Sequence, residues 1–404
     1  MALDFTAAAG AMKKFYLPAL REQINNKTIL LEQVERSSEH VEGEEWVMSL
    51  HVSRNPGVGA RAEGGTLPTA GNQSYKATRG PVRENDGRFQ VTGKIIKALA
   101  SDRGSFIRAV DSEMKGLKKD VPRDVNRQCF GTSDGVIATC GVTSASTTVV
   151  LAATTPMSAM RQLEVGMIID IGTVATPTSV ASARTITANN GTARTIVISG
   201  AAVTTAATDF VFRSGNGGSG VNQKELTGLK TIVSDSGILF DVDPATYPVW
   251  KATRFHNSGT LRPISEPLLE QVMDEVSIAS GEEIDLWMWS YGIHRAFGNL
   301  LTTLKRFPNT IDLKGGHKGL EITSGGQTAA ATRDRDCQDN SAYALNTKHL
   351  FSPEMSDWEF MDEDGAVLSR VSNQHAYEGT LFKFHELVPD QRNAHGVLED
   401  IREG

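Results

Sequence analysis

Residues 130–135, FGTSDG, hold the residue types most suggestive of catalysis, because they contain a G-x-S-x-G match. That pattern can present a nucleophilic serine on a sharp turn, which needs a buried strand before it and a helix after it. Here a charged helical pattern precedes the turn and a β-rich composition follows it. We therefore interpret 130–135 as a Gly/Ser hinge.

Phosphate and metal binding are also poorly supported. Residues 57–65, GVGARAEGG, share only their glycine content with phosphate loops and lack the Gly-Lys-Ser/Thr ending. Asp362, Glu363 and Asp364 could bind a cation, but an EF-hand needs further ligands at fixed spacing. The 9 histidines show no H-E-x-x-H pair. We interpret residues 57–65 as a flexible loop tip and residues 362–364 as a solvated turn. We expect no catalytic residue, no cofactor, no metal and no enzyme activity.

Composition narrows the class of protein. The chain has 404 residues, enough for two to three domains, with 39% hydrophobic and 22% charged residues. Its net charge of −7 argues against a protein whose main task is to clamp nucleic acid. No apolar run is long enough for a membrane span, and the N-terminus lacks a secretory signal pattern. The cysteines Cys129, Cys140 and Cys337 have no metal spacing and predict free thiols in a reducing compartment.

The chain is organised around a long amphipathic stretch, Gly93 to Arg127. From Ile107 onward its apolar residues recur at gaps of three and four, which predicts a helix with one apolar stripe. Pro122 predicts a kink or a fresh start near the end. Such a helix must lie along another element.

Before this helix the sequence favours extended structure. Residues 1–44 form an arm, interrupted by Pro18, in which 28–35 could be strand or helix. Residues 45–93 read as one long hairpin with a flexible, glycine-rich tip. Because a two-stranded ribbon is marginal alone, we expect it to lie against another subunit or element. The candidate inter-subunit contacts are Trp46, Met48, Leu50, Val52, Tyr75 and Phe89.

Residues 131–222 have a different composition. Only eight charged residues occur among these 92, and short β-branched runs alternate with Gly and Asn-Asn-Gly turns. The pattern predicts a small β-sandwich or barrel, and flexible Gly/Ser joints at both ends suggest an insertion into a host domain.

The remaining chain alternates strand and helix and then returns to strands. A strand is possible at 229–233, a helix at 263–281 ending in Gly281, a buried strand at 284–290 and a helix at 291–304. Strands are expected at 342–350, 358–361 and 379–388.

This order of parts resembles the major capsid protein of tailed bacteriophages, with the Hong Kong 97-like fold. The matching stretches are YLPALREQINNKTILLEQVE, the glycine-tipped ribbon, the long helix ending NRQCFG, RDRDCQDNSAYALNTKHLFSPEMSDWEFMDEDGAVLS, and RNAHGVL. The resemblance covers residues 1–130 and about 223–404, and 131–222 departs from the minimal pattern.

The resemblance implies an α+β fold with named parts. They are an N-terminal arm (1–44), an extended E-loop hairpin (45–93), the spine helix of the peripheral domain (94–130), an inserted β-rich domain (131–222), an axial α/β domain (223–330) and peripheral strands with the C-terminal segment (331–404).

The resemblance also implies partners and a location. The partners would be other copies of the chain in pentamers and hexamers, a scaffold, a portal and decoration proteins, and double-stranded DNA packaged without sequence-specific binding, with no membrane. The location would be the virion, after assembly in the host cytoplasm. Some relatives carry a Lys–Asn cross-link between subunits, for which Lys76 is a weak candidate. An encapsulin-like compartment shell, a carbohydrate-binding protein and an enzyme remain as alternatives.

Overall fold

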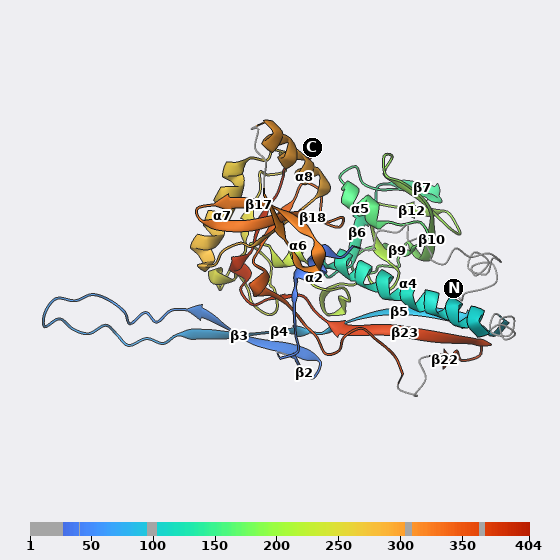
Figure 1. Ribbon diagram of the computed structural model, residues 1–404, viewed down its shortest axis with the longest axis horizontal. Helices are drawn as coiled ribbons and strands as arrows, with labels where there is room; N and C mark the ends of the chain where they lie inside the picture. The colour runs from blue at the N-terminus through green and yellow to red at the C-terminus, as the bar shows by residue number, and fades with distance from the viewer. Residues whose placement is uncertain (1–26, 40, 95–102, 304–308, 363–367) are drawn as a thin grey trace.

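The computed structural model describes residues 27–39, 41–94, 103–303, 309–362 and 368–404. Figure 1 shows an elongated molecule in which a long ribbon projects from one end and a long helix lies at the other. Two groups of sheets and helices stand beside each other above that long axis. The described chain therefore consists of two compact bodies, a long helix and a projecting ribbon.

The long helix is α4 (Arg103–Phe130), and the first part of the predicted stretch, 95–102, lies outside the described residues. The predicted fresh start at Pro122 is wrong, because α4 continues through this residue as one helix. Its stripe packs on a strand at Gly87, where an added Cβ would come within 2.5 Å of Val121 and 2.8 Å of Leu117. Glycine at this position lets the helix lie directly on the strand.

The strand beneath α4 is β5 (Arg83–Thr92), which pairs antiparallel with β23 (Ala376–His385) along ten residues, from Arg83↔His385 to Thr92↔Ala376. The other edge of β23 pairs with β21 (Glu359–Phe360) and β22 (Ser369–Arg370). Residues 363–367, which include most of the predicted acidic turn, lie outside the described residues.

The ribbon, which we define as residues 45–81, consists of β3 (Glu45–Ser53), the loop 54–73 and β4 (Ser74–Pro81). A short strand, β2 (Val41–Glu42), extends its sheet at the base. The prediction of one hairpin over 45–93 is therefore too long. Only β4 returns along β3, whereas β5 leaves after Val82 to pair with β23, a strand almost 300 positions away that local patterning could not reveal.

A seven-stranded mixed sheet forms the centre of one body, in the order β14-β25-β19-β15-β18-β17-β16. Its strands are β14 (Thr253–Phe255), β15 (Leu286–Trp289), β16 (Thr310–Asp312), β17 (Lys318–Ser324), β18 (Gln327–Arg333), β19 (Ala342–Leu345) and β25 (Gly396–Leu398). The predicted buried strand is β15, and every residue of it is buried. Met288 faces the main core and Trp287 the second core, so both faces of the sheet are covered.

Helices cover both faces of this sheet. The second core lies under α7 (Glu266–Ser280) and α8 (Tyr291–Thr303), both predicted, and Gly281 ends α7 in the left-handed region at φ 77°. The main core, on the other face, includes residues of α2 (Ile29–Gln33), α4 and α6 (Leu229–Ile232). The strand suggested at 229–233 is wrong. Leu229 and Ile232, three positions apart, share one side of a short helix and are both buried.

Residues 136–213 form a separate β structure with its own core. Its main sheet has six strands in the order β6-β13-β9-β10-β11-β8, and β7 pairs with β12 beside it. The elements are β6 (Val136–Thr139), β7 (Thr143–Ser146), β8 (Thr148–Val150), α5 (Met157–Gln162), β9 (Ile168–Gly172), β10 (Ala181–Asn190), β11 (Thr195–Ile198), β12 (Val203–Thr205) and β13 (Phe210–Arg213). The predicted β-branched runs all coincide with strands.

Smaller elements complete the described chain. A three-stranded sheet joins β1 (Glu35–Ser37), β20 (Leu350–Pro353) and β24 (Val388–Pro389). Single 3₁₀ turns are η1 (Gly220–Asn222), η2 (Pro248–Trp250), η3 (Lys314–Gly316), η4 (Thr347–His349) and η5 (Arg392–Ala394). The last of these, η5, packs against α7 and η2.

Candidate assembly interface

Trp46, the first of the predicted inter-subunit contacts, lies at the base of the ribbon. Its side chain is 0% exposed and packs edge-on against Phe240 of the same chain, with ring centroids 4.6 Å apart. Phe351 and Val388 complete this small core. In the single chain Trp46 therefore packs within its own subunit, and its contact with a neighbour stays a prediction.

The other residues in phase with Trp46 also face their own chain. Leu50 is buried in the main core, and Met48 and Val52 pack half-buried against that core. Phe89 is buried in the β5–β23 ladder, where an added Cβ on Gly379 would come within 2.6 Å of its ring. The alternation of apolar residues over 46–52 therefore correctly predicts a strand, but the apolar face of that strand covers the subunit's own core.

The outward face of the ribbon carries the surface that a neighbour could cover. Tyr75 is 68% exposed and sits opposite His51, with ring centroids 5.3 Å apart. Val47, on the same face, is 39% exposed, and the loop residues Val58 and Leu67 are 85% and 81% exposed. Of the six predicted contacts, Tyr75 thus remains the fully accessible one. Val47, Val58 and Leu67 are not among the predicted contacts, although Val47 is an apolar residue out of phase with the main alternation of β3, which is a usable signal.

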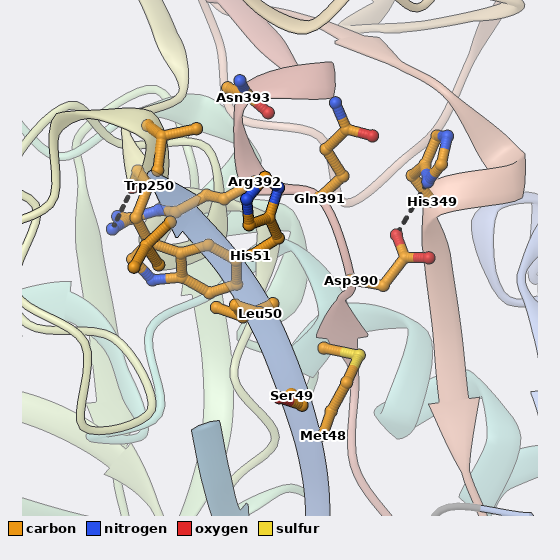
Figure 2. Close-up of a pocket in the computed structure, with 12 residues that line it drawn as sticks. Met48, Ser49, Leu50, His51, Trp250, His349, Asp390, Gln391, Arg392 and Asn393 are labelled. Atoms are coloured by element: carbon orange, nitrogen blue, oxygen red, sulfur yellow. Dashed lines mark hydrogen bonds and ion pairs between the residues drawn. The ribbon is translucent and has the colours of Figure 1, made fainter. Parts of the chain in front are cut away.

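A pocket of about 330 Å³ lies where β3 passes over η2 and η5. Figure 2 shows Leu50 and His51 on one side of it and the pair His349 and Asp390 on another. His349 Nδ1 and Asp390 Oδ1 are 2.8 Å apart. Ser49 also lines the pocket, but Figure 2 places it on β3, away from that pair, so the three do not form a hydrogen-bonded triad.

The predicted hinge at 130–135 follows α4 directly. α4 ends at Phe130 and β6 begins at Val136, so the strand that a nucleophile elbow needs before its serine is missing. Ser133 is buried in this connection. Across the described ranges, no group of three or more His, Cys, Asp or Glu side chains could hold a metal ion. None of the helices that the structure describes has both the length and the apolarity needed to cross a membrane.

The C-terminal part of α4 carries a buried charge network that joins the bodies. Arg127 donates to Asp124 at 3.0 Å and also pairs with Glu225, while Arg213 of β13 donates to Asp124 at 2.9 Å. Burial would raise the pKa of Asp124, but the two arginines hold that pKa well below its ordinary value. The helix end therefore fixes the β structure 136–213 against the rest of the chain.

A second buried carboxylate, Glu386, ties the β5–β23 ladder to the segment after the β structure. Its Oε1 accepts from the backbone N–H of Thr227 at 2.7 Å and of Leu387 at 2.9 Å, and Arg83 Nε lies 3.3 Å from its Oε2. Burial raises the pKa of Glu386 to about 7, although these partners oppose the rise. Polar networks of this kind specify how elements dock.

Comparison with known proteins bears on the fold. No protein-family model matches the sequence, and no curated protein sequence does so. A chain of the cyanophage A-1(L) capsid asymmetric unit aligns with a TM-score of 0.56 at 13% identity, covering 96% of this chain and 97% of that one. This chain has the fold of a phage capsid subunit.

Two further solved structures align along nearly the whole capsid fold. The capsid of the native GTA particle has a TM-score of 0.50 at 9% identity and covers 99% of this chain and 99% of that one. The holo-SrpI encapsulin of Synechococcus elongatus has a TM-score of 0.48 at 10% identity and covers 98% of this chain and 95% of that one. The predicted α+β, capsid-like fold is confirmed at this level by the first two alignments.

Proposed function

We propose that the chain is a major capsid protein that self-assembles into the icosahedral head of a tailed bacteriophage around double-stranded DNA. The correspondence with the cyanophage capsid chain over 96% of this chain and 97% of that chain carries the proposal. The activity is assembly and not catalysis, and it needs no cofactor. The protein is assembled in the host cytoplasm and resides in the virion.

The parts of the chain take the roles of the Hong Kong 97-like plan in this proposal. Residues 1–44 are the N-terminal arm, the ribbon 45–81 is the E-loop and 94–130 is the spine helix. Residues 223–330 with β19 and β25 are the axial domain, and β5 with the rest of 331–404 is the peripheral domain. Residues 131–222 are an inserted domain, which is supported by the separate core within 136–213.

The ribbon supports self-association. It projects from the body, its inward face is covered by its own chain, and its outward face and tip expose Tyr75, Val47, Val58 and Leu67 (Figure 1). Large apolar side chains gathered on a projecting element mark an interaction surface. In a closed shell this surface meets another copy of the same chain in pentamers and hexamers. Scaffold, portal and decoration proteins are the further partners that we propose for such a shell.

Electron microscopy of the purified protein tests the proposal. We expect icosahedral particles in negative stain and a mass in the megadalton range by light scattering. A monomer or small oligomer under all assembly conditions, including co-expression with a neighbouring scaffold gene, would contradict it. Terminase and portal genes beside the coding sequence would favour the phage over an encapsulin-like compartment.

A further inference from the structure

The turn Leu239–Val242 is a strained element that touches the base of the ribbon. Leu239 and Val242 exchange two backbone hydrogen bonds of 3.1 Å, and between them Phe240 and Asp241 have φ of 52° and 63°. Two consecutive left-handed residues define the turn type that strongly prefers Asn-Gly. A side chain is sterically disfavoured in this region of φ, so surrounding contacts must hold the turn in place.

The contacts that hold the turn come from the ribbon. The ring of Phe240 packs edge-on against Trp46 of β3, with centroids 4.6 Å apart. The carbonyl of Phe240 accepts a 2.8 Å hydrogen bond from the Thr78 hydroxyl of β4, and Asp241 lies 3.2 Å from the Arg79 guanidinium. Both strained residues therefore contact the base of the ribbon, each by a different kind of interaction.

Glycine on the ribbon makes this approach possible. A Cβ added to Gly80 would lie 2.9 Å from Phe240 Cδ1 and 2.9 Å from Trp46 Nε1. The ribbon backbone is thus in direct contact with the aromatic pair. Any larger residue at position 80 would push the ribbon and the turn apart.

The body holds the other side of the turn. Leu239 and Val242 are buried in the main core, and the Trp250 indole N–H donates to the Leu239 carbonyl at 3.2 Å. The Arg392 guanidinium donates to the carbonyls of five residues around the turn, at 2.8 to 3.4 Å: Thr231, Ile232, Ser236, Gly237 and Trp250. The turn is therefore fixed to the body and presents Phe240 and Asp241 to the ribbon.

Beyond the turn, the support under the ribbon is incomplete. The pocket of about 330 Å³ lies beneath β3 at residues 48–52 (Figure 2). From residue 54 onward the ribbon extends away from the body (Figure 1). A small change of angle at the base would consequently become a large displacement at the tip, with room at the pocket for β3 to tilt.

We propose that the turn Leu239–Val242 sets the direction in which the ribbon projects, through the Phe240–Trp46 and Phe240–Thr78 contacts. Phe240 and Thr78 are positioning residues, because they act through the ribbon and not by touching a neighbouring subunit. The inference rests on the proposed function in one respect: the direction of the ribbon decides whether its exposed face meets another copy of the chain. The direction itself is a property of the isolated subunit.

Distance measurement on isolated subunits tests the proposal without any assembly. Spin labels are placed at Ala70→Cys near the tip and Asp274→Cys on α7, both exposed positions, while the native cysteines are buried. We expect a narrow distance distribution in the parent. Thr78→Val, which removes the hydroxyl at nearly constant volume, and Phe240→Ala should each broaden or shift it.

Gln73→Ala is the matched control. It removes the 2.6 Å His51–Gln73 hydrogen bond of the ribbon but no contact with the turn, so its distribution should match the parent. If Phe240→Ala fails to fold, the milder Thr78→Val still decides. An unchanged distribution in a folded Thr78→Val variant and in a folded Phe240→Ala variant would overturn the proposal. If the variants change the distance distribution as expected but the parent protein forms no particles, the result would count against the proposed function alone.

Discussion

Arg213, at the end of the last strand of the β structure, donates a 2.9 Å hydrogen bond to Asp124 of the long helix. The sequence suggested that this β structure hangs on flexible glycine joints. The start of its exit is held to the β structure itself, because Asp170 of β9 accepts hydrogen bonds from Ser214 and Gly215. The β structure and α4 are thus docked through charge.

Removing Asp124 should be costly, because it sits between two arginines. In Asp124→Ala, the buried Arg127 keeps only Glu225, and we expect a loss of roughly 3 kcal/mol of unfolding free energy. Arg213→Ala, which removes a guanidinium that is 43% exposed, should cost less than about 1 kcal/mol. Urea denaturation of both variants measures the difference, and equal costs would contradict the assignment of Asp124 as the buried centre.

Trp46 and Tyr75 should separate folding from assembly. Trp46→Ala removes a fully buried side chain and should cost about 3–5 kcal/mol of stability. Tyr75→Asp alters a side chain that is 68% exposed, and should leave the thermal transition within a few degrees of the parent while lowering particle yield several-fold. Thermal melts and particle counts by negative stain check both; normal particle yield from Tyr75→Asp would remove this face from the interface.

Much of the fold could be predicted from local patterns. Gly281 at the end of α7, the alternation in β3 and the buried run of β15 follow from residue spacing alone, and their physical reasons hold in the structure. The low charge and β-branched runs of residues 131–222 likewise predict a β-rich segment, and strands are found there. These signals work because helix ends, strand periods and turns depend on neighbours a few positions away.

What could not be predicted depends on distant partners. Nothing near Trp46 in the sequence indicates that Phe240 and Val388 will cover it, so the alternation alone does not reveal that this face of the ribbon packs on its own chain. The pairing of β5 with β23 is equally remote. Pro122 is a local signal that tertiary packing overrode, since Val121 and Val125 on either side of it are both buried.

Arg392 should tolerate no substitution by lysine. Its guanidinium serves five carbonyls, whereas an ammonium group has only three donors, so Arg392→Lys takes the donor from at least two of them. Only the Ser236 carbonyl has a second donor among the interactions described, the Ser234 hydroxyl at 3.1 Å. We expect a loss of about 2 kcal/mol or more, measured by urea denaturation. The exposed Arg402→Lys serves as the control and should leave stability within about 0.5 kcal/mol of the parent.

His395 should make the protein less stable in acid. It is fully buried, with Nε2 3.1 Å from the His349 carbonyl, and burial lowers its pKa from 6.5 to about 4. Between these values the unfolded chain binds a proton that the folded chain does not, so stability falls as pH drops through this window. The slope approaches about 1.4 kcal/mol per pH unit for this group.

Comparison with a variant isolates that slope. Glu386 has the opposite sign, since burial raises its pKa from 4.5 to about 7 and stability falls as pH rises between those values. This contribution is common to the parent and His395→Gln, so it cancels in their difference. His395→Gln should lose less stability than the parent between about pH 6.5 and about pH 4, whereas the exposed His256→Gln should match the parent. The same change in unfolding free energy with pH for parent and His395→Gln, measured by urea denaturation at each pH, would refute the prediction.

The antiparallel ladder of β5 and β23 has a consequence for synthesis. β5 is translated almost 300 residues before its partner β23, and β25 (Gly396–Leu398) must follow before β14 is paired. Long-range pairings of this kind form late. A nascent chain therefore lacks these two strand pairings until residues 376–398 have left the ribosome, and a product truncated before them would leave β5 and β14 without their partner strands.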